Sequence, residues 1–149
     1  MPDEQRSASI SVFFPAYNDA ASIASLVETA LAVLPMVADD YEVIIVNDGS
    51  TDATQAVLEE LARAHPRVRV IQHARNMGYG AALRNGFKHA RMDLIFYTDG
   101  DGQYDVRELV ALRALLTARV DVVNGLKIKR ADKHYRRFMG EIGAGNIGT

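Results

Sequence analysis

The chain has 149 residues, of which 48% are hydrophobic, and a formal net charge of -2 at pH 7. This length allows one domain with a hydrophobic core and is too short for two ordinary domains. The charge balance gives no sign of nucleic-acid binding, and the absence of cysteine excludes disulfides, thiolate catalysis and cysteine-based zinc sites.

Apolar strands alternate with amphipathic helices along the chain. In chain order, the pattern predicts strand 10–14, helix 20–34, strand 42–46, helix 53–64, strand 68–71, helix 80–90, strand 94–97, helix 106–118 and strand 120–123. Asp19 is expected to cap the first helix, and Asp105 the last. The second helix has three candidate caps, Ser50, Thr51 and Asp52.

This alternation predicts an α/β protein with a mostly parallel sheet and helices on both faces. In such sheets, ligands bind beyond the carboxyl ends of the strands. Polar clusters follow three of the predicted strands directly, at 15–19, 47–52 and 99–103. We therefore expect the three clusters to meet on one rim of the sheet.

The cluster at 99–103 alternates oxygen-bearing side chains with glycines. Asp99, Asp101 and Gln103 can turn toward one point, while Gly100 and Gly102 allow a close approach of backbone and ligand. Oxygen ligands suit Mg²⁺ or Mn²⁺, which often completes its shell with water and substrate phosphate. The alternative is a polar turn without a metal, because Asp and Gly are common turn residues.

Two further loops carry candidate ligand contacts. Asp48 stands at a strand end, where a carboxylate can accept hydrogen bonds from a nucleotide base or from ribose. The glycine-rich loop 76–80 precedes a helix, where backbone N–H groups can meet an anion, so Gly80 is a candidate contact. The dinucleotide fingerprint G-x-G-x-x-G fails here because position 83 is Leu83.

Four motifs occur in order along the chain: Phe14–Asn18, Val46–Asp52, Asn76-x-Gly78-x-Gly80 and Asp99-x-Asp101-x-Gln103. Together they resemble the family 2 nucleotide-sugar glycosyltransferases. A later basic pattern, Gly125-x-Lys127-x-x-Arg130 with Arg136, is similar to the branch that transfers sugars to polyisoprenyl phosphates, including the dolichyl-phosphate mannosyltransferase type. The resemblance covers residues 10 to about 137.

The resemblance implies an inverting, metal-dependent hexosyltransferase with a Rossmann-like GT-A fold and a UDP- or GDP-sugar donor. It places Pro15, Ala16, Tyr17 and Asp48 at the base and ribose. It implies that the metal ligands are Asp99, Asp101 and Gln103. It also implies that the nucleotide-sugar donor contacts Asp19, Gly80, Gly100 and Lys127. The catalytic residues implied are Asp101, Arg130 and Arg136, with the arginines on phosphate charge. Asp19 stands where the family usually has Glu, and Lys127 where it usually has Arg.

The implied acceptor is a polyprenyl phosphate, and the basic segment 127–137 offers a peripheral membrane contact at the inner face of the membrane. The alternative for this segment is a solvated basic face. No apolar stretch is long enough to cross a bilayer, so we expect a cytoplasmic protein. The sequence leaves the base, the sugar and the oligomeric state open.

We expect one incomplete GT-A domain over 1–149, with flexible ends at 1–9 and 138–149. The family normally continues into an acceptor-binding half that carries a general base, so that base is expected beyond residue 149. Two rival functions remain at this point. One is a nucleotide- and metal-binding fragment that transfers nothing, and the other is a nucleotidyltransferase that makes the activated sugar.

Overall fold

The structure is a computed structural model that describes residues 9–103, 105–116, 125–127 and 136–138. The chain divides into two compact units, Met1–Arg107 and Glu108–Thr149, which are described separately. The single domain expected over 1–149 stays a prediction. None of the helices in the described residues is both long enough and apolar enough to span a bilayer.

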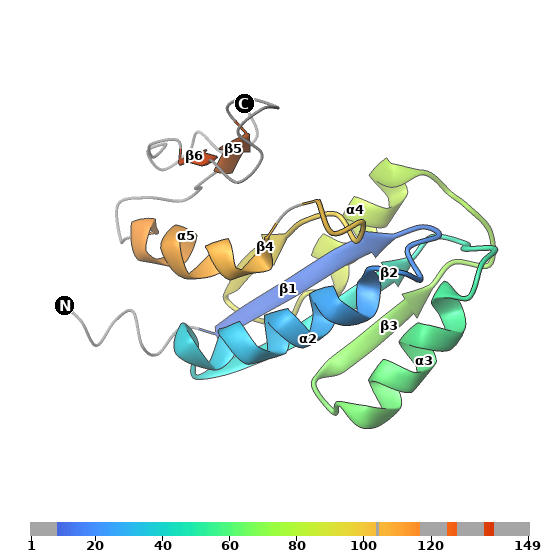
Figure 1. The fold of residues 1–149 in the computed structure, drawn as a ribbon, viewed down its shortest axis with the longest axis horizontal. Coiled ribbons are helices and arrows are strands. Elements are labelled where there is room, and N and C mark those ends of the chain that lie inside the picture. Colours follow the sequence, from blue (N-terminus) through green and yellow to red (C-terminus); the bar gives the residue numbers. More distant parts are fainter. Residues whose placement is uncertain (1–8, 104, 117–124, 128–135, 139–149) are drawn as a thin grey trace. The chain divides into compact units, whose positions relative to one another are not determined.

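The first unit is built on four parallel strands in the order β3-β2-β1-β4 (Figure 1). They are β1 (Ser9–Ala16), β2 (Asp40–Asn47), β3 (Val68–Gln72) and β4 (Leu94–Tyr97). Phe13 of β1 lies in register with Ile44 of β2 on one side and Tyr97 of β4 on the other. The predicted α/β class with a mostly parallel sheet is confirmed.

Helices cover both faces of this sheet. Helices α2 (Ile23–Val33) and α3 (Thr54–Ala64) lie on one face, and α4 (Tyr79–His89) lies on the other (Figure 1). On the α4 side, Phe13, Ile44 and Val46 pack with Ala82 in a buried cluster. The alternation of strand side chains turns the buried Phe14 and its neighbours to the opposite face. Burial on both faces explains the nearly continuous apolar runs of β1 and β2.

The first helix begins later than predicted, at Ile23 rather than Ala20. The Asp19 carboxylate accepts a hydrogen bond from the Tyr17 N–H, so it does not cap the helix, and the predicted cap is wrong. The main-chain carbonyl of Asp19 accepts bonds from Ser22 and Ile23, which holds residues 20–22 in a turn before the helix. A short 3₁₀ turn, η1 (Leu34–Met36), follows α2.

The predicted helix 106–118 is also corrected. Its first residues form a 3₁₀ turn, η2 (Val106–Glu108), and α5 runs only over Leu109–Leu115. The Leu116 N–H still bonds to the Arg113 carbonyl, but Leu116 itself is extended, with φ -85° and ψ 100°, which ends the helix. The strand predicted at 120–123 lies outside the described residues. In the second unit, β5 (Gly125–Lys127) pairs antiparallel with β6 (Arg136–Phe138).

Helix α4 approaches β1 closely at Gly86. A Cβ atom built on Gly86 would lie 2.3 Å from the ring of the fully buried Phe13. In contrast, a Cβ on Gly80, in the same helix, would meet only the end of the Arg84 side chain at 3.4 Å. The absence of a side chain at Gly86 therefore lets α4 pack against β1.

These two glycines make a matched test of the packing. Both Gly86→Ala and Gly80→Ala gain helix propensity, whereas only Gly86→Ala forces a methyl group into Phe13. We expect the unfolding free energy of Gly86→Ala to be about 2–4 kcal/mol below that of Gly80→Ala. Urea unfolding of both variants measures the difference, and equal stabilities would contradict the close approach.

Candidate functional site

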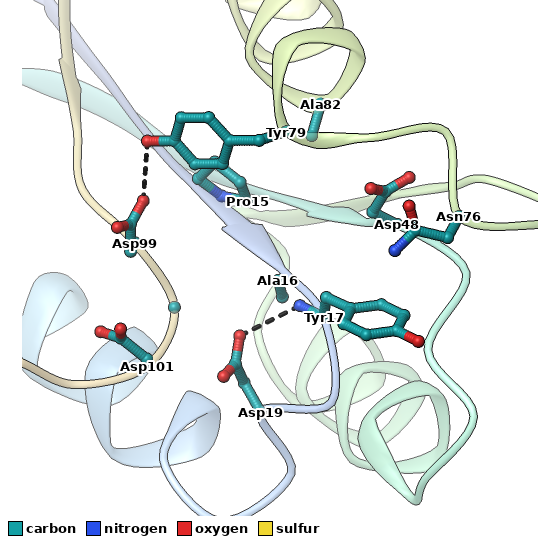
Figure 2. A pocket seen from close by; sticks show the side chains of 11 residues that line it. Pro15, Ala16, Tyr17, Asp19, Asp48, Asn76, Tyr79, Ala82, Asp99 and Asp101 are labelled. Atoms are coloured by element: carbon teal, nitrogen blue, oxygen red, sulfur yellow. Dashed lines mark hydrogen bonds between the residues drawn. The ribbon is translucent and has the colours of Figure 1, made fainter.

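A pocket of about 330 Å³ opens beyond the carboxyl ends of β1, β2 and β4 (Figure 2). Its walls come from the loops that follow these strands and from the start of α4. The residues that line it are Pro15, Ala16, Tyr17, Asp19, Asp48, Asn76, Tyr79, Ala82, Asp99, Gly100 and Asp101. The three polar clusters singled out in the sequence thus contribute to one site.

Some predicted site residues lie elsewhere. Gly80 and Gln103 are not among the residues that line the pocket, and the backbone N–H of the exposed Gln103 donates to Asp101 Oδ1 at 3.0 Å. Lys127 and Arg136 belong to β5 and β6, and their side chains are outside what the structure describes. Arg130 also lies outside the described residues.

Sequence reasoning missed the side chains of Asn76, Tyr79 and Ala82 as parts of the wall. The glycine-rich loop drew attention to its backbone N–H groups, although Asn76 and Tyr79 lie within it. Tyr79 and Ala82 are three residues apart on α4, and this spacing places them on one face of the helix. That spacing becomes informative only once the start of the helix is known.

The loops after β1 and β2 are joined by hydrogen bonds to Asn18. Its backbone is in the left-handed region, with φ 54°, and its side-chain Oδ1 accepts a bond from the Thr51 N–H at 2.8 Å. The Asn18 N–H donates in turn to Ser50 Oγ at 3.0 Å. These bonds fix the loop that carries Tyr17 against the loop after β2.

Carboxylates from separate loops gather around the pocket. Burial raises the pKa of Asp19 above its usual value of 3.8, the hydrogen bond from the Tyr17 N–H lowers it, and the negative charges of Asp101, Asp52 and Asp99 raise it further. The net effect is a raised pKa. This accumulation of negative charge makes the rim a favourable place for a cation.

The donor chemistry fits a hard divalent metal held in part by its substrate. Within the described residues, no group of three or more His, Cys, Asp and Glu side chains forms a complete metal cage. Asp99 and Asp101 both line the pocket, however, and their oxygens are ligands that suit Mg²⁺ or Mn²⁺. Mg²⁺ is commonly bound by one or two carboxylates together with substrate phosphates, so these two residues fit such an ion.

Gly100 fixes the loop between these two carboxylates. Its N–H donates to the Pro15 carbonyl at 3.0 Å, and its own carbonyl accepts a bond from Ser22 Oγ at 2.8 Å. A Cβ atom on Gly100 would lie 3.0 Å from the Pro15 carbonyl and 3.1 Å from Asp19 Oδ2. The glycine therefore allows the loop after β4 to lie directly against the end of β1.

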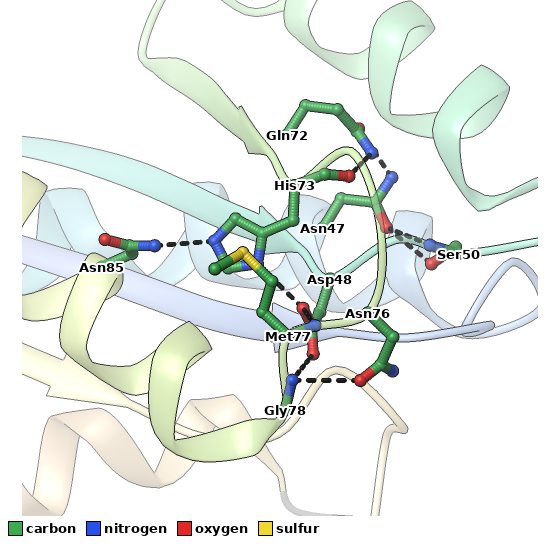
Figure 3. A network of polar contacts seen from close by, with 9 residues as sticks. All are labelled: Asn47, Asp48, Ser50, Gln72, His73, Asn76, Met77, Gly78 and Asn85. Atoms are coloured by element: carbon green, nitrogen blue, oxygen red, sulfur yellow. Dashed lines mark hydrogen bonds and ion pairs between the residues drawn. The ribbon is translucent and has the colours of Figure 1, made fainter.

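Asp48 is the buried charge of the site, with an exposed fraction of 4% (Figure 3). Its Oδ1 accepts hydrogen bonds from His73 Nδ1–H and the Met77 N–H, both at 2.8 Å, and its Oδ2 accepts one from the Gly78 N–H at 3.1 Å. Burial by itself raises the pKa of Asp48, but the bonds from His73, Met77 and Gly78 outweigh burial and hold it below 3.8.

His73 has a hydrogen-bonding partner at each ring nitrogen. Nδ1 faces the Asp48 carboxylate, which only accepts, and Nε2 faces the Asn85 amide nitrogen at 2.7 Å, which only donates. The imidazole therefore donates its Nδ1–H to Asp48, and Nε2 faces the Asn85 amide. Asp48 was predicted to contact the base and ribose, and the structure adds a second role, because this carboxylate organises the loop before α4.

Gly49 brings the same loop close to β2. It has φ 70°, and a Cβ atom on it would lie 2.3 Å from the backbone of Arg75 and Asn76. Glycine is required here for both its backbone conformation and its lack of a side chain. Together, Asp48 and Gly49 hold the loop before α4 on the end of β2.

Comparisons with known proteins show what this chain is similar to. The family model described as "Glycosyl transferase family 2" matches residues 11–143. An undecaprenyl-phosphate 4-deoxy-4-formamido-L-arabinose transferase from Edwardsiella ictaluri is 33% identical, over 86% of this chain and 40% of its own length. A dolichyl-phosphate beta-glucosyltransferase from Trichomonas vaginalis is 36% identical, over 66% of this chain and 31% of its own. The chain thus spans two fifths or less of these curated relatives.

Solved structures show the same fold. A mannosyltransferase from Pyrobaculum calidifontis, in complex with GDP-Man and Mn²⁺, matches with a TM-score of 0.69 and 23% identity, over 86% of this chain and 38% of its own. TarS 1-349 from S. aureus, in complex with UDP, matches with a TM-score of 0.54 and 29% identity, over 62% of this chain and 27% of its own. These likenesses confirm the predicted GT-A type architecture.

The Asp48 network predicts how stability depends on pH. Because folding holds the Asp48 pKa below its ordinary value, the stabilising bonds are fully present above about pH 5 and are lost as the pH falls through the lowered pKa. We expect Asp48→Asn to be about 1–3 kcal/mol less stable than wild type at pH 7, since its amide N–H₂ would meet N–H donors. Between pH 5 and pH 3, the unfolding free energy of Asp48→Asn should also fall less than that of wild type.

Urea unfolding at several pH values measures both effects. Glu28→Gln, on the exposed side of α2, is the matched charge-removing control and should keep wild-type stability at pH 7. If the curves of Asp48→Asn and wild type ran parallel between pH 5 and pH 3, the stabilising role of the ionised Asp48 would be wrong.

Proposed function

This chain belongs to glycosyl transferase family 2, as its motifs indicate, and we propose that it binds a UDP- or GDP-hexose with a divalent metal for inverting transfer to a polyprenyl phosphate. The observation that carries the proposal is the acidic pocket beyond the parallel strands. Its wall combines the Tyr17 ring with carboxylates from three separate loops. A nucleoside diphosphate held through a metal ion matches that combination of groups.

The base and ribose are assigned to the part of the pocket formed by Pro15, Ala16, Tyr17 and Asp48. Tyr17 has an exposed fraction of 46%, so its ring is accessible to a flat base. Among the residues that the structure describes, Asp48 Oδ2 accepts one bond, from Gly78, and a carboxylate oxygen has capacity for a further donor from the nucleotide. UDP in TarS and GDP-Man in the Pyrobaculum enzyme support this class of ligand.

Asp99 and Asp101 are assigned to the metal, with Gln103 as the third predicted ligand and Asp19 beside them. A bound Mg²⁺ or Mn²⁺ would supply charge that stabilises the leaving nucleoside diphosphate. The protein's part is to hold the two carboxylates on the short loop that Gly100 fastens to β1. Gly80 and Lys127 remain assigned to the donor as predictions.

The acceptor assignment rests on the named relatives, which act on undecaprenyl phosphate and dolichyl phosphate. In the proposed step, an acceptor phosphate oxygen forms a bond to the sugar C1 while the bond from C1 to the diphosphate oxygen breaks. Attack from the side opposite the leaving diphosphate inverts the configuration at C1. The phosphate oxygen is already ionised at neutral pH, so no proton has to be removed. Arg130 and Arg136 are assigned to the phosphate charges.

The donor assignment predicts metal-dependent nucleotide binding. We expect calorimetric titration to show that either UDP or GDP binds the purified chain at least tenfold more tightly with Mn²⁺ than without it, because a metal held by Asp99 and Asp101 would supply positive charge for the diphosphate. The double variant Asp99→Ala/Asp101→Ala should lose that enhancement. Glu28→Gln, which removes one acidic charge away from the pocket, should keep it. Folded protein that binds neither nucleotide would contradict the proposal.

The acceptor assignment predicts formation of a lipid-linked sugar. With undecaprenyl phosphate, Mn²⁺ and the sugar nucleotide of the preferred base, the chain should release nucleoside diphosphate as the lipid product forms. Arg130→Ala and Arg136→Ala should each reduce the rate at least tenfold, whereas Lys129→Ala, in the same basic segment, should not. Nucleotide binding without transfer would favour the rival binding function for this chain.

A further inference from the structure

We propose that Tyr79 is a positioning residue for the metal ligand Asp99, and that its phenol holds this carboxylate ready for the cation. The inference rests on the proposed function, because it concerns the metal of the donor site. Its basis is a contact that no sequence motif assigned. Tyr79 O–H donates a hydrogen bond to Asp99 Oδ1 at 2.8 Å (Figure 2).

This hydrogen bond joins two walls of the pocket that come from distant parts of the chain. Tyr79 is the first residue of α4, and Asp99 follows β4. Both residues line the pocket. Only Oδ1 of Asp99 accepts a hydrogen bond from the residues that the structure describes, so Oδ2 remains for a ligated cation.

On the Tyr79 side of this hydrogen bond, the buried Asp48 fixes the backbone. The two N–H groups immediately before Tyr79, those of Met77 and Gly78, donate to the Asp48 carboxylate. The Gly78 N–H is also within 3.0 Å of Asn76 Oδ1. The direction in which α4 leaves the loop, and with it the position of the Tyr79 ring, therefore depends on these bonds.

The backbone at the aspartate end is fixed by Gly100, whose N–H and carbonyl bond to Pro15 and to Ser22. Since other hydrogen bonds already hold both backbones, neither loop has to become more ordered when the phenol bonds to the carboxylate. The hydrogen bond therefore costs little conformational entropy to form.

The charges near Asp99 show why such a bond matters. Asp101 and Asp19 also line the pocket, and before a cation binds, their negative charges repel the Asp99 carboxylate. A phenol donor opposes that repulsion and keeps one oxygen directed toward the pocket. Tyr79 is 54% exposed, so the bond adds little to folding stability, and its main effect falls on metal binding.

The test compares Tyr79→Phe, which keeps the ring and removes only the hydroxyl, with wild type. Mn²⁺ is titrated into the protein with saturating UDP or GDP, whichever wild type binds, and free Mn²⁺ is followed by electron paramagnetic resonance. We expect the Mn²⁺ dissociation constant to rise about 10- to 100-fold in Tyr79→Phe. Nucleotide affinity at saturating Mn²⁺ and the urea unfolding midpoint should match wild type.

Tyr41→Phe is the matched control, because Tyr41 lies near the start of β2, beneath the Arg67 guanidinium, and should keep wild-type Mn²⁺ affinity. Unchanged Mn²⁺ affinity in Tyr79→Phe would overturn this inference and would leave the proposed function unaffected. Weaker nucleotide binding at saturating Mn²⁺ would also overturn it, since Tyr79 would then contact the nucleotide itself. Failure of wild type to bind Mn²⁺ would overturn both the inference and the proposed metal-dependent function.

Discussion

The buried carboxylate of Asp48 is the interaction on which the site depends. A charge that is 4% exposed is costly unless donors surround it, and the donors here are His73 and the N–H groups of Met77 and Gly78. Satisfying this charge therefore fixes the loop before α4. The start of the helix follows from that loop, and the phenol of Tyr79 reaches across the pocket as a result.

The rim combines the buried carboxylate of Asp48, which accepts three hydrogen bonds, with more exposed carboxylates that repel one another. The pKa of Asp19 is raised first by burial and then by the negative charges of nearby carboxylates, among them Asp101 and Asp99. Folding alone gains nothing from such repulsion, so the arrangement is best understood through a ligand that brings positive charge. The proposed metal and diphosphate supply that charge, and the chain's membership of glycosyl transferase family 2 agrees with it.

Local signals predicted strands well and helix starts less well. The strand predicted at 94–97 has the observed bounds, because its apolar run is short and bounded by polar residues. Asp19 instead shows the ambiguity of a cap signal. A carboxylate before a helix can accept a bond from the helix or from the residue two positions earlier, and here it accepts from Tyr17. The sequence pattern is the same in both cases.

The sequence alone determined the order of strands and helices along the chain, the parallel sheet, the rim where the polar clusters meet, and the family. These depend on apolar periodicity and on motifs that lie close together along the chain. Only the tertiary structure decided that His73 and Asn85 support Asp48 and that Tyr79 bonds to Asp99. Those partners stand 12 to 25 residues apart. They meet because of strand register and helix direction, which no local pattern encodes.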